Sequence, residues 1–423
     1  MIKKLIGIIS RKGTARNFMT LVSGTTLAQV FSLIFYPILA RMFSAENFGL
    51  LSLLSSISAI ITVIASGKYE QAIIITRNRS EAINVASLSL ICSIIVCGVI
   101  FVIMLFFSEM ILVTADNETL KGWIYLSPLI AFFIIIYNTF NEWCVKKSSF
   151  SALAINKITN AGSISLSKFG FGLARVGGGL VWGEVLGRGL SALSCLFHWL
   201  RVDKADFKLV TWKKIRAMSK KYVDFPKYTM PDQIINTFTG NLSILFIVTY
   251  FGEANLGYYA MTQNVLAIPM TFVGQAVMDV FRNRANQDFE RTGCCQEIYN
   301  KLLRKLIPAI IAILASVILF LPSIFVFVLG EKWRVAGELS QILAPAIAVG
   351  FLGNAFMSVW IIAGKLKQRF MWQVFYFCMI LSSMLIGCIF FNDMKKAIYC
   401  LSIGLSVSYG TSIFFTWRYS RGK

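Results

Sequence analysis

The sequence predicts an all-α fold: a polytopic membrane protein of about twelve transmembrane helices, arranged in two six-helix lobes. Three observations lead to this prediction. Hydrophobic residues fill 57% of the 423 positions, and charged residues only 14%. Apolar stretches of roughly 20 residues, the length that crosses a bilayer as a helix, recur along the whole chain. The second half of the chain also repeats features of the first half at a constant spacing.

The chain is strongly basic, with a formal net charge of +21. In a soluble protein such a charge would suggest a nucleic-acid partner. Here the Lys and Arg residues lie in short segments between apolar stretches, so the orientation of the chain in a membrane explains them better. We therefore expect a lipid bilayer around the protein and no nucleic acid as a partner.

Twelve spans follow from apolar length and from the Gly, Pro and charged residues that interrupt it. They lie near residues 18–40, 49–73, 84–107, 123–140, 155–175, 178–200, 229–251, 257–281, 306–329, 340–363, 370–391 and 397–417. The longest connection, 201–228, is basic and divides the chain. We expect an N-terminal six-helix lobe over 1–200 and a C-terminal six-helix lobe over 229–423.

The distribution of cations predicts the orientation of these spans. With the N-terminus inside, the cytoplasmic segments hold 31 Lys and Arg residues and the outer segments hold 7, when Lys68 is counted at the inner end of the second span. Lys and Arg are retained on the cytoplasmic side during insertion, whereas acidic residues contribute little. Both termini and the 201–228 connection are therefore predicted to be cytoplasmic.

The two halves of the chain match without gaps at an offset of 208 residues, and a short triplet recurs nearby. The matched positions are Phe43, Asn47 and Gly49 with Phe251, Asn255 and Gly257, and Arg77-Asn78-Arg79 with Arg282-Asn283-Arg284. Six spans per half give both repeats the same orientation. Such repeats are related by a pseudo-two-fold axis along the membrane normal, and a substrate path is expected at their interface.

No sequence motif predicts an enzyme. The Gly-Lys pairs at 67–68 and 364–365 lack the spacing and the hydroxyl residue of a nucleotide-binding loop. The one histidine, His198, has no carboxylate or cysteine cluster at a metal-ligand spacing. We therefore predict no catalytic residue, no metal and no cofactor.

Ionisable residues within the fifth and sixth spans are the main candidate site. Each disfavours insertion by roughly 2.5 to 3.5 kcal/mol, so it needs water or a partner. At 100° per residue Lys157, Lys168 and Arg175 share one helix face, a cationic ladder that is suited to an anionic substrate. In the sixth span Glu184 precedes Arg188 by four residues, which equally fits a purely structural ion pair.

Two aspartates near the inner ends of the seventh and eighth spans are candidates for ion coupling. Asp232 and Asp279 fall at related positions of the second lobe. They fit a transporter that is driven by a proton or sodium gradient. They equally fit interfacial acids that touch the basic connections.

Several motifs, spread over most of the chain, carry a resemblance to a known family. They are Leu21–Gln29, Tyr36–Arg41, Asn47–Gly49, Gly67–Ile73, Gly330–Trp333, Ala336-Gly337 and Leu343–Pro345. Together they resemble bacterial O-antigen and polysaccharide repeat-unit flippases, members of the multidrug, oligosaccharidyl-lipid and polysaccharide exporter superfamily. Four polar residues inside these motifs join the candidate path of the substrate head group: Gln29, Arg41, Lys68 and Glu70.

The resemblance implies a specific function. Members of this family turn oligosaccharides on an undecaprenyl diphosphate carrier from the cytoplasmic to the periplasmic leaflet of the bacterial inner membrane, by alternating access. A polysaccharide polymerase and a chain-length regulator would be partners of such a flippase in lipopolysaccharide biosynthesis. The diphosphate would give the cationic ladder its physical purpose, because Lys and Arg can accompany an anion through a region of low dielectric constant.

Two other functions fit parts of the same pattern. A multidrug or toxic-compound antiporter of the same superfamily would share the fold, but a basic cavity would not help it to bind organic cations. A membrane polysaccharide polymerase should have a large outer catalytic loop, whereas the largest loop here is basic and predicted to be cytoplasmic. The sign of the charge in the cavity therefore discriminates between flippase and antiporter.

Overall fold

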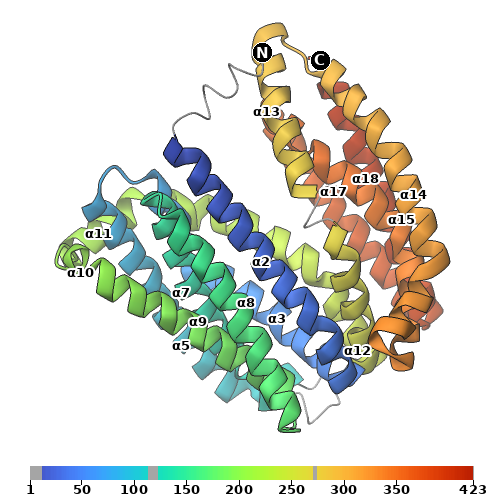
Figure 1. The fold of residues 1–423 in the computed structure, drawn as a ribbon, viewed down its shortest axis with the longest axis horizontal. Coiled ribbons are helices and arrows are strands. Elements are labelled where there is room, and N and C mark those ends of the chain that lie inside the picture. Colours follow the sequence, from blue (N-terminus) through green and yellow to red (C-terminus); the bar gives the residue numbers. More distant parts are fainter. Residues whose placement is uncertain (1–11, 113–121, 270–273, 423) are drawn as a thin grey trace. The chain divides into compact units, whose positions relative to one another are not determined.

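The computed structural model describes residues 12–112, 122–269 and 274–422. Every regular element in these three ranges is a helix or a helical turn, as the sequence predicts. The chain forms two compact units (Figure 1). The first contains Met1–Phe43 and Leu53–Phe238, and the second contains Ser44–Ser52 and Thr239–Lys423. The domain boundaries proposed from the sequence, at 200 and 229, stay a prediction.

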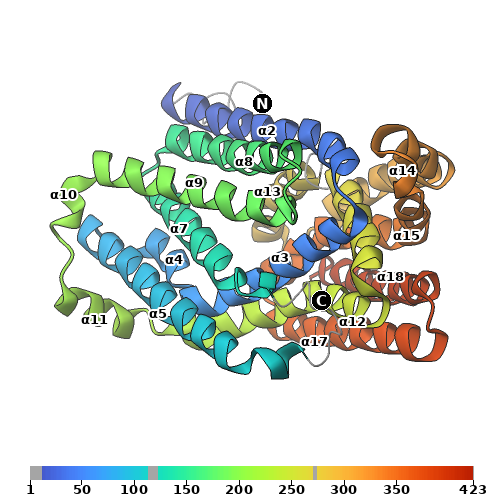
Figure 2. The same ribbon diagram turned by 90° about the horizontal axis from the view of Figure 1, so that it is seen from below.

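The first unit is built mainly from long helices. They are α2 (Lys12–Met42), most of α3 (Ala45–Ser66), α5 (Arg79–Leu112), α7 (Ser127–Lys146), α8 (Phe150–Leu173), α9 (Gly179–Val202) and the start of α12 (Met230–Pro269). Short elements connect them: α4 (Tyr69–Ala72), η1 (Ile73–Ile75), α10 (Lys204–Phe207), α11 (Trp212–Lys221) and η2 (Phe225–Thr229). Neighbours pack in the order α2, α8, α9, α7, α5 and α11 (Figure 2).

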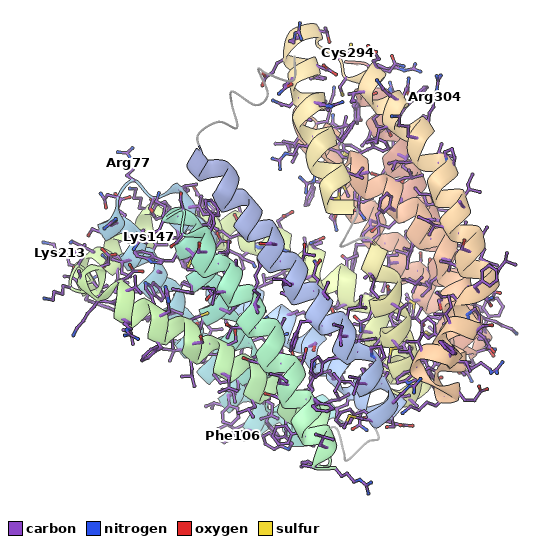
Figure 3. The ribbon with its side chains drawn as sticks, viewed as in Figure 1. Arg77, Phe106, Lys147, Lys213, Cys294 and Arg304 are labelled. Carbon is purple, nitrogen blue, oxygen red and sulfur yellow. The ribbon has the colours of Figure 1, made fainter. Side chains whose placement is uncertain are left out.

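An aromatic core closes one end of the first unit. The ring centroids of Trp143 and Trp199 lie 5.5 Å apart, and both side chains are buried. Trp143 Nε1 donates a 2.8 Å hydrogen bond to Asp203, which also pairs with Lys147. Figure 3 shows Lys147 at this end, with Phe106 at the opposite end of the unit. The connections that contain Lys147 and Asp203 therefore lie at the same end of the first unit, and the predicted topology stays a prediction.

The second unit contains the remaining helices. They are the rest of α12, α13 (Gln275–Thr292), α14 (Gln296–Leu329), η4 (Glu331–Trp333), α15 (Arg334–Phe356), α16 (Ser358–Ile362), α17 (Leu366–Leu385), η5 (Ile386–Phe390) and α18 (Met394–Tyr419). Long helices pack in the order α14, α15, α18 and α17. The rings of Tyr299 and Phe356 stack at 3.9 Å in a buried cluster with Phe281.

Ten helices within the described ranges are long and apolar enough to cross a membrane. The α12 helix covers parts of two predicted spans. Gly252 (φ 82°) interrupts it with a non-helical conformation and so separates the two parts. The α8 helix is not among the ten, since Lys157, Lys168 and several hydroxyl and amide side chains lower its mean hydropathy. The count of twelve spans stays a prediction.

Many large apolar side chains are highly exposed on the surface of the described helices. Phe106, Phe327 and Phe390 are 81%, 84% and 80% exposed. Large apolar side chains that are this exposed favour an apolar environment. The exposed helix faces therefore fit the interior of a bilayer.

Candidate functional site

A buried ion cluster joins α8 and α9. Lys168 Nζ lies 2.6 Å from one carboxylate oxygen of Glu184, and Arg188 Nε donates a hydrogen bond to the other. Glu184 is only 4% exposed. Two cations share one carboxylate, so the cluster carries a net charge of +1. The pair within α9 agrees with the structural ion pair that the sequence offered as an alternative, and Lys168 of α8 joins it.

Two glycines of α9 allow this cluster to form. A Cβ atom on Gly183 would lie 2.6 Å from the Cα atom of Lys168, and a Cβ atom on Gly187 would lie 2.4 Å from the Cα atom of Ile164. Real Cβ atoms do not approach a backbone so closely, so only glycine fits at either position. This close approach of α9 to α8 brings Glu184 within reach of Lys168.

A tight turn connects α8 to α9 and contains Arg175. The α8 helix ends at Leu173, and Arg175 (φ 51°) and Gly178 (φ 67°) have left-handed backbone conformations. The Arg175 side chain is exposed in this turn. The helical projection that places Arg175 on the face of Lys157 and Lys168 is therefore wrong, because the helix ends first. Whether Arg175 contacts a substrate stays a prediction.

Lys157 has a different neighbour from Lys168. Its Nζ atom donates a 3.0 Å hydrogen bond to Thr25 Oγ1 on α2. Close packing of the two helices makes this contact possible, since a Cβ atom on Gly24 would lie 2.4 Å from the Cβ atom of Ala154. Lys157 thus contacts α2, whereas Lys168, roughly 16 Å along the helix axis, contacts α9.

The two α2 residues of the candidate path lie at different depths. Gln29 is half-buried and lies one helical turn beyond Thr25, on the same face of α2. Arg41 is exposed in the last turn of α2, roughly 18 Å from Gln29 along the helix axis. Gln29 thus extends the surface formed by Thr25 and Lys157, and Arg41 lies at the far end of the helix.

Lys68 and Glu70 form a second buried cluster, between α3 and α5. Lys68 has a left-handed conformation (φ 59°), and its Nζ atom lies 3.6 Å from Glu70 Oε1. Ser66 Oγ donates a 3.3 Å hydrogen bond to the same oxygen. Glu70 Oε2 is buried and accepts no hydrogen bond from the described residues.

Glu142 on α7 completes this second cluster. It lies close enough to Glu70 and Lys68 for electrostatic interaction with both. Two carboxylates with one Lys give a net charge of −1 when all are ionised. Sequence reasoning missed Ser66 and Glu142; the position of Glu142 just after an apolar stretch was the available signal. The first unit thus contains two charge clusters of opposite net charge, one between α8 and α9 and the other around Glu70.

The proposed coupling residues lie outside these clusters. Asp232 is exposed in the first turn of α12. Asp279 lies on α13, but its side chain falls outside the part of the chain that the structure describes. Within the described ranges, no group of three His, Cys, Asp or Glu residues could hold a metal ion.

The positive cluster on α8 and α9 is suited to an anion. Its carboxylate fixes the two cations in place but neutralises only one of them. Both cations keep part of their side chains exposed, so the excess positive charge can attract an anionic group, most strongly where water is scarce. It would repel an organic cation for the same reason.

The chain is similar to known proteins of polysaccharide and teichuronic acid biosynthesis. A family model described as "Polysaccharide biosynthesis protein" matches residues 38–338. The teichuronic acid biosynthesis protein TuaB of Bacillus subtilis (strain 168) is 24% identical over 163 residues, which are 38% of this chain and 33% of that relative. The alignment thus covers about a third of the relative's length.

Solved structures with a similar fold are transporters. An inward-facing multidrug resistance MATE family transporter of the MOP superfamily has a TM-score of 0.72 at 16% identity, and the match covers 94% of each chain. The lipid II flippase MurJ, in an inward closed conformation, has a TM-score of 0.74 at 12% identity, over 93% of this chain and 87% of that one. Identities this low show a shared fold alone.

Proposed function

The chain belongs to the polysaccharide biosynthesis protein family and is a multi-pass membrane protein, and we propose that it is a flippase for lipid-linked oligosaccharides. Its substrate is an O-antigen or another polysaccharide repeat unit on undecaprenyl diphosphate. It moves this substrate from the cytoplasmic to the periplasmic leaflet of a bacterial inner membrane by alternating access. Both termini lie in the cytoplasm, and the protein catalyses no chemical reaction.

The observation that carries this proposal is the net positive cluster of Lys168, Glu184 and Arg188. A diphosphate must lose much of its hydration to cross the bilayer, and fixed cations can replace part of that hydration. Glu184 holds both cations in position, and the excess charge attracts the head group. Lys157, Arg175, Gln29 and Arg41 contact the head group at other points along its path, while the lipid tail stays in the bilayer.

The second cluster and the coupling residues have separate roles in this proposal. Lys68 and Glu70 lie on the head-group path at one end of the first unit. Asp232 and Asp279 couple transport to a proton or sodium gradient. No cofactor is required, and a polysaccharide polymerase and a chain-length regulator act on the product.

A multidrug or toxic-compound antiporter is the second candidate, because a MATE transporter shares the fold. The positive cluster argues against it, since a buried excess cation disfavours an organic cation. A membrane polysaccharide polymerase is less well supported, because the two proteins of similar fold are a MATE family transporter and the lipid II flippase MurJ.

Complementation of a deletion strain tests the proposal. Lys168→Ala and Arg188→Ala should each reduce surface polysaccharide while the protein stays inserted, and Lys168→Arg should be milder because it keeps the charge. Arg201→Ala, an exposed change at the end of the same α9 helix, serves as control. Full export by the Lys168→Ala, Arg188→Ala double variant would refute the role of the cluster.

A further inference from the structure

The second unit contains a small polar cavity that none of the roles above uses. Its volume is about 220 Å³. The polar residues of its lining come from four helices: Arg282 from α13, Asn354 from α15, Ser358 from α16 and Arg369 from α17. All four lie in the second unit, so the cavity belongs to one packed body.

A break between α15 and α16 shapes this cavity. The α15 helix ends at Phe356, and Met357 N donates a 3.2 Å hydrogen bond to the carbonyl oxygen of Asn354. Phe356 and Trp360 are fully buried on either side of the break and hold it in place. The α13 helix packs against both α15 and α16, and α16 packs against α17. These contacts bring the two arginines to the same cavity.

The polar groups around the cavity lack partners in the described part of the chain. Ser358 Oγ is buried without a hydrogen bond. Neither Arg282 nor Arg369 forms an ion pair with a described residue. A buried hydroxyl without a partner costs free energy, so it indicates a group that is supplied from outside.

We propose that this cavity, the Arg282–Arg369 pocket, binds a phosphoryl group. Two guanidinium groups present paired N–H donors that match the oxygen atoms of a phosphate, and Asn354 and Ser358 add neutral donors. With a charge of +2 and no described carboxylate in its lining, the pocket selects an anion. Its volume accommodates a phosphate or a diphosphate but not a folded macromolecule.

Two lipids present this group at a membrane surface. One is the carrier lipid, through its diphosphate, and this choice rests on the proposed function. The other is an anionic phospholipid, through its head group. Arg282 begins the repeated Arg-Asn-Arg triplet, and Arg369 lies in the first turn of α17. The sequence predicts the cytoplasmic side for both, where the carrier would lie before transport.

Binding to the full-length protein in phosphatidylcholine nanodiscs tests the pocket. Inorganic pyrophosphate is titrated by calorimetry into the wild type, an Arg282→Gln, Arg369→Gln variant, and a control, Arg284→Gln, Lys367→Gln. The control removes the same charge from residues two positions away that do not line the pocket; all four residues are exposed, so the two variants differ in position and not in exposure. We expect the wild type and the control to bind alike, and the pocket variant to bind at least about tenfold more weakly, equivalent to about 1.4 kcal/mol.

A second variant and a second ligand complete the test. Ser358→Ala, which removes only the hydroxyl, should weaken pyrophosphate binding without affecting folding. Retention of phosphatidylglycerol, measured by native mass spectrometry, should fall in the pocket variant if the source is a phospholipid, and should be unchanged if it is the carrier. Equal pyrophosphate binding by wild type and pocket variant, or none by the wild type, would overturn the pocket. Failure of the wild type to restore export, with pyrophosphate binding intact, would instead overturn the proposed function alone.

Discussion

Gly49 and Gly257 are matched positions of the sequence repeat, 208 residues apart, and each lies against the backbone of the other's helix. A Cβ atom on Gly49 would lie 2.0 Å from the carbonyl oxygen of Glu253. A Cβ atom on Gly257 would lie 1.8 Å from the carbonyl oxygen of Ala45. The start of α3 and the part of α12 after its kink therefore touch through backbone atoms, where only glycine fits.

Alanine at either glycine should destabilise the protein. Because the clash is with backbone atoms, the helices must separate, and overpacking of this kind costs about 1–3 kcal/mol or more. Gly49→Ala and Gly257→Ala should each lower the melting temperature of the purified protein in detergent. Gly240→Ala, on the same α12 helix with open space around it, should have little effect. Equal melting temperatures for all three variants would contradict this contact.

Removal of Glu184 should destabilise the protein more than removal of one of the two cations that it binds. Glu184→Gln leaves Lys168 and Arg188, whose side chains are 14% and 25% exposed, without their anion. Loss of one partner of a largely buried ion pair costs up to about 3–5 kcal/mol. The amount of folded protein should fall sharply. Adding Lys168→Met to Glu184→Gln should restore part of the stability, since one unpaired cation disappears. Purely additive losses in this double-mutant cycle would mean that the two residues do not interact.

The thiol of Cys295 should be slow to react. Burial raises its pKa to about 11, with smaller contributions from Cys294 and Asp288. A raised pKa means that the folded state disfavours the thiolate, so this group destabilises the fold as pH rises above the ordinary thiol pKa of about 8.5. In a variant with Cys295 as its one cysteine, the alkylation rate should keep rising between pH 9 and 11. A plateau near pH 9 would show an ordinary, accessible thiol and would contradict this prediction.

Reporter fusions test the predicted topology. Fusions after Ser108 and Gly252 should report the periplasm, and fusions within 201–228 and at the C-terminus should report the cytoplasm. The physical basis is the retention of Lys and Arg on the cytoplasmic side. A cytoplasmic signal from either of the first two fusions would remove the twelve-span arrangement.

Ion coupling through the two aspartates has its own test. Asp232→Asn and Asp279→Asn remove the charge that would bind a proton or sodium ion, so export should fall and should respond less to the membrane gradient. The measurement is surface polysaccharide in a complemented deletion strain, with and without collapse of the gradient. If both variants export fully under both conditions, coupling depends on other residues.

Apolar length predicted the all-helical fold of this protein, although the short helices α10 and α11 lie in a segment that was predicted only as a connection. A membrane span must satisfy its own backbone hydrogen bonds, so a long apolar stretch has little choice but a helix. The α8 helix forms even though its hydropathy is low, because α2 and α9 pack against both sides of it. The break at Gly252 agrees with the sequence, in which one predicted span ends at residue 251 and the next begins at residue 257.

The sequence by itself determined which charged residues need water or a partner, because Lys168, Glu184 and Arg188 fall within predicted spans. Only the tertiary structure decided their partners. Contacts between helices depend on close approach at particular glycines, such as Gly183, and on where a helix ends, as α8 does before Arg175. The same holds for Glu142 beside Glu70 and for Arg369 beside Arg282, because these pairs are far apart in the chain and meet only through packing.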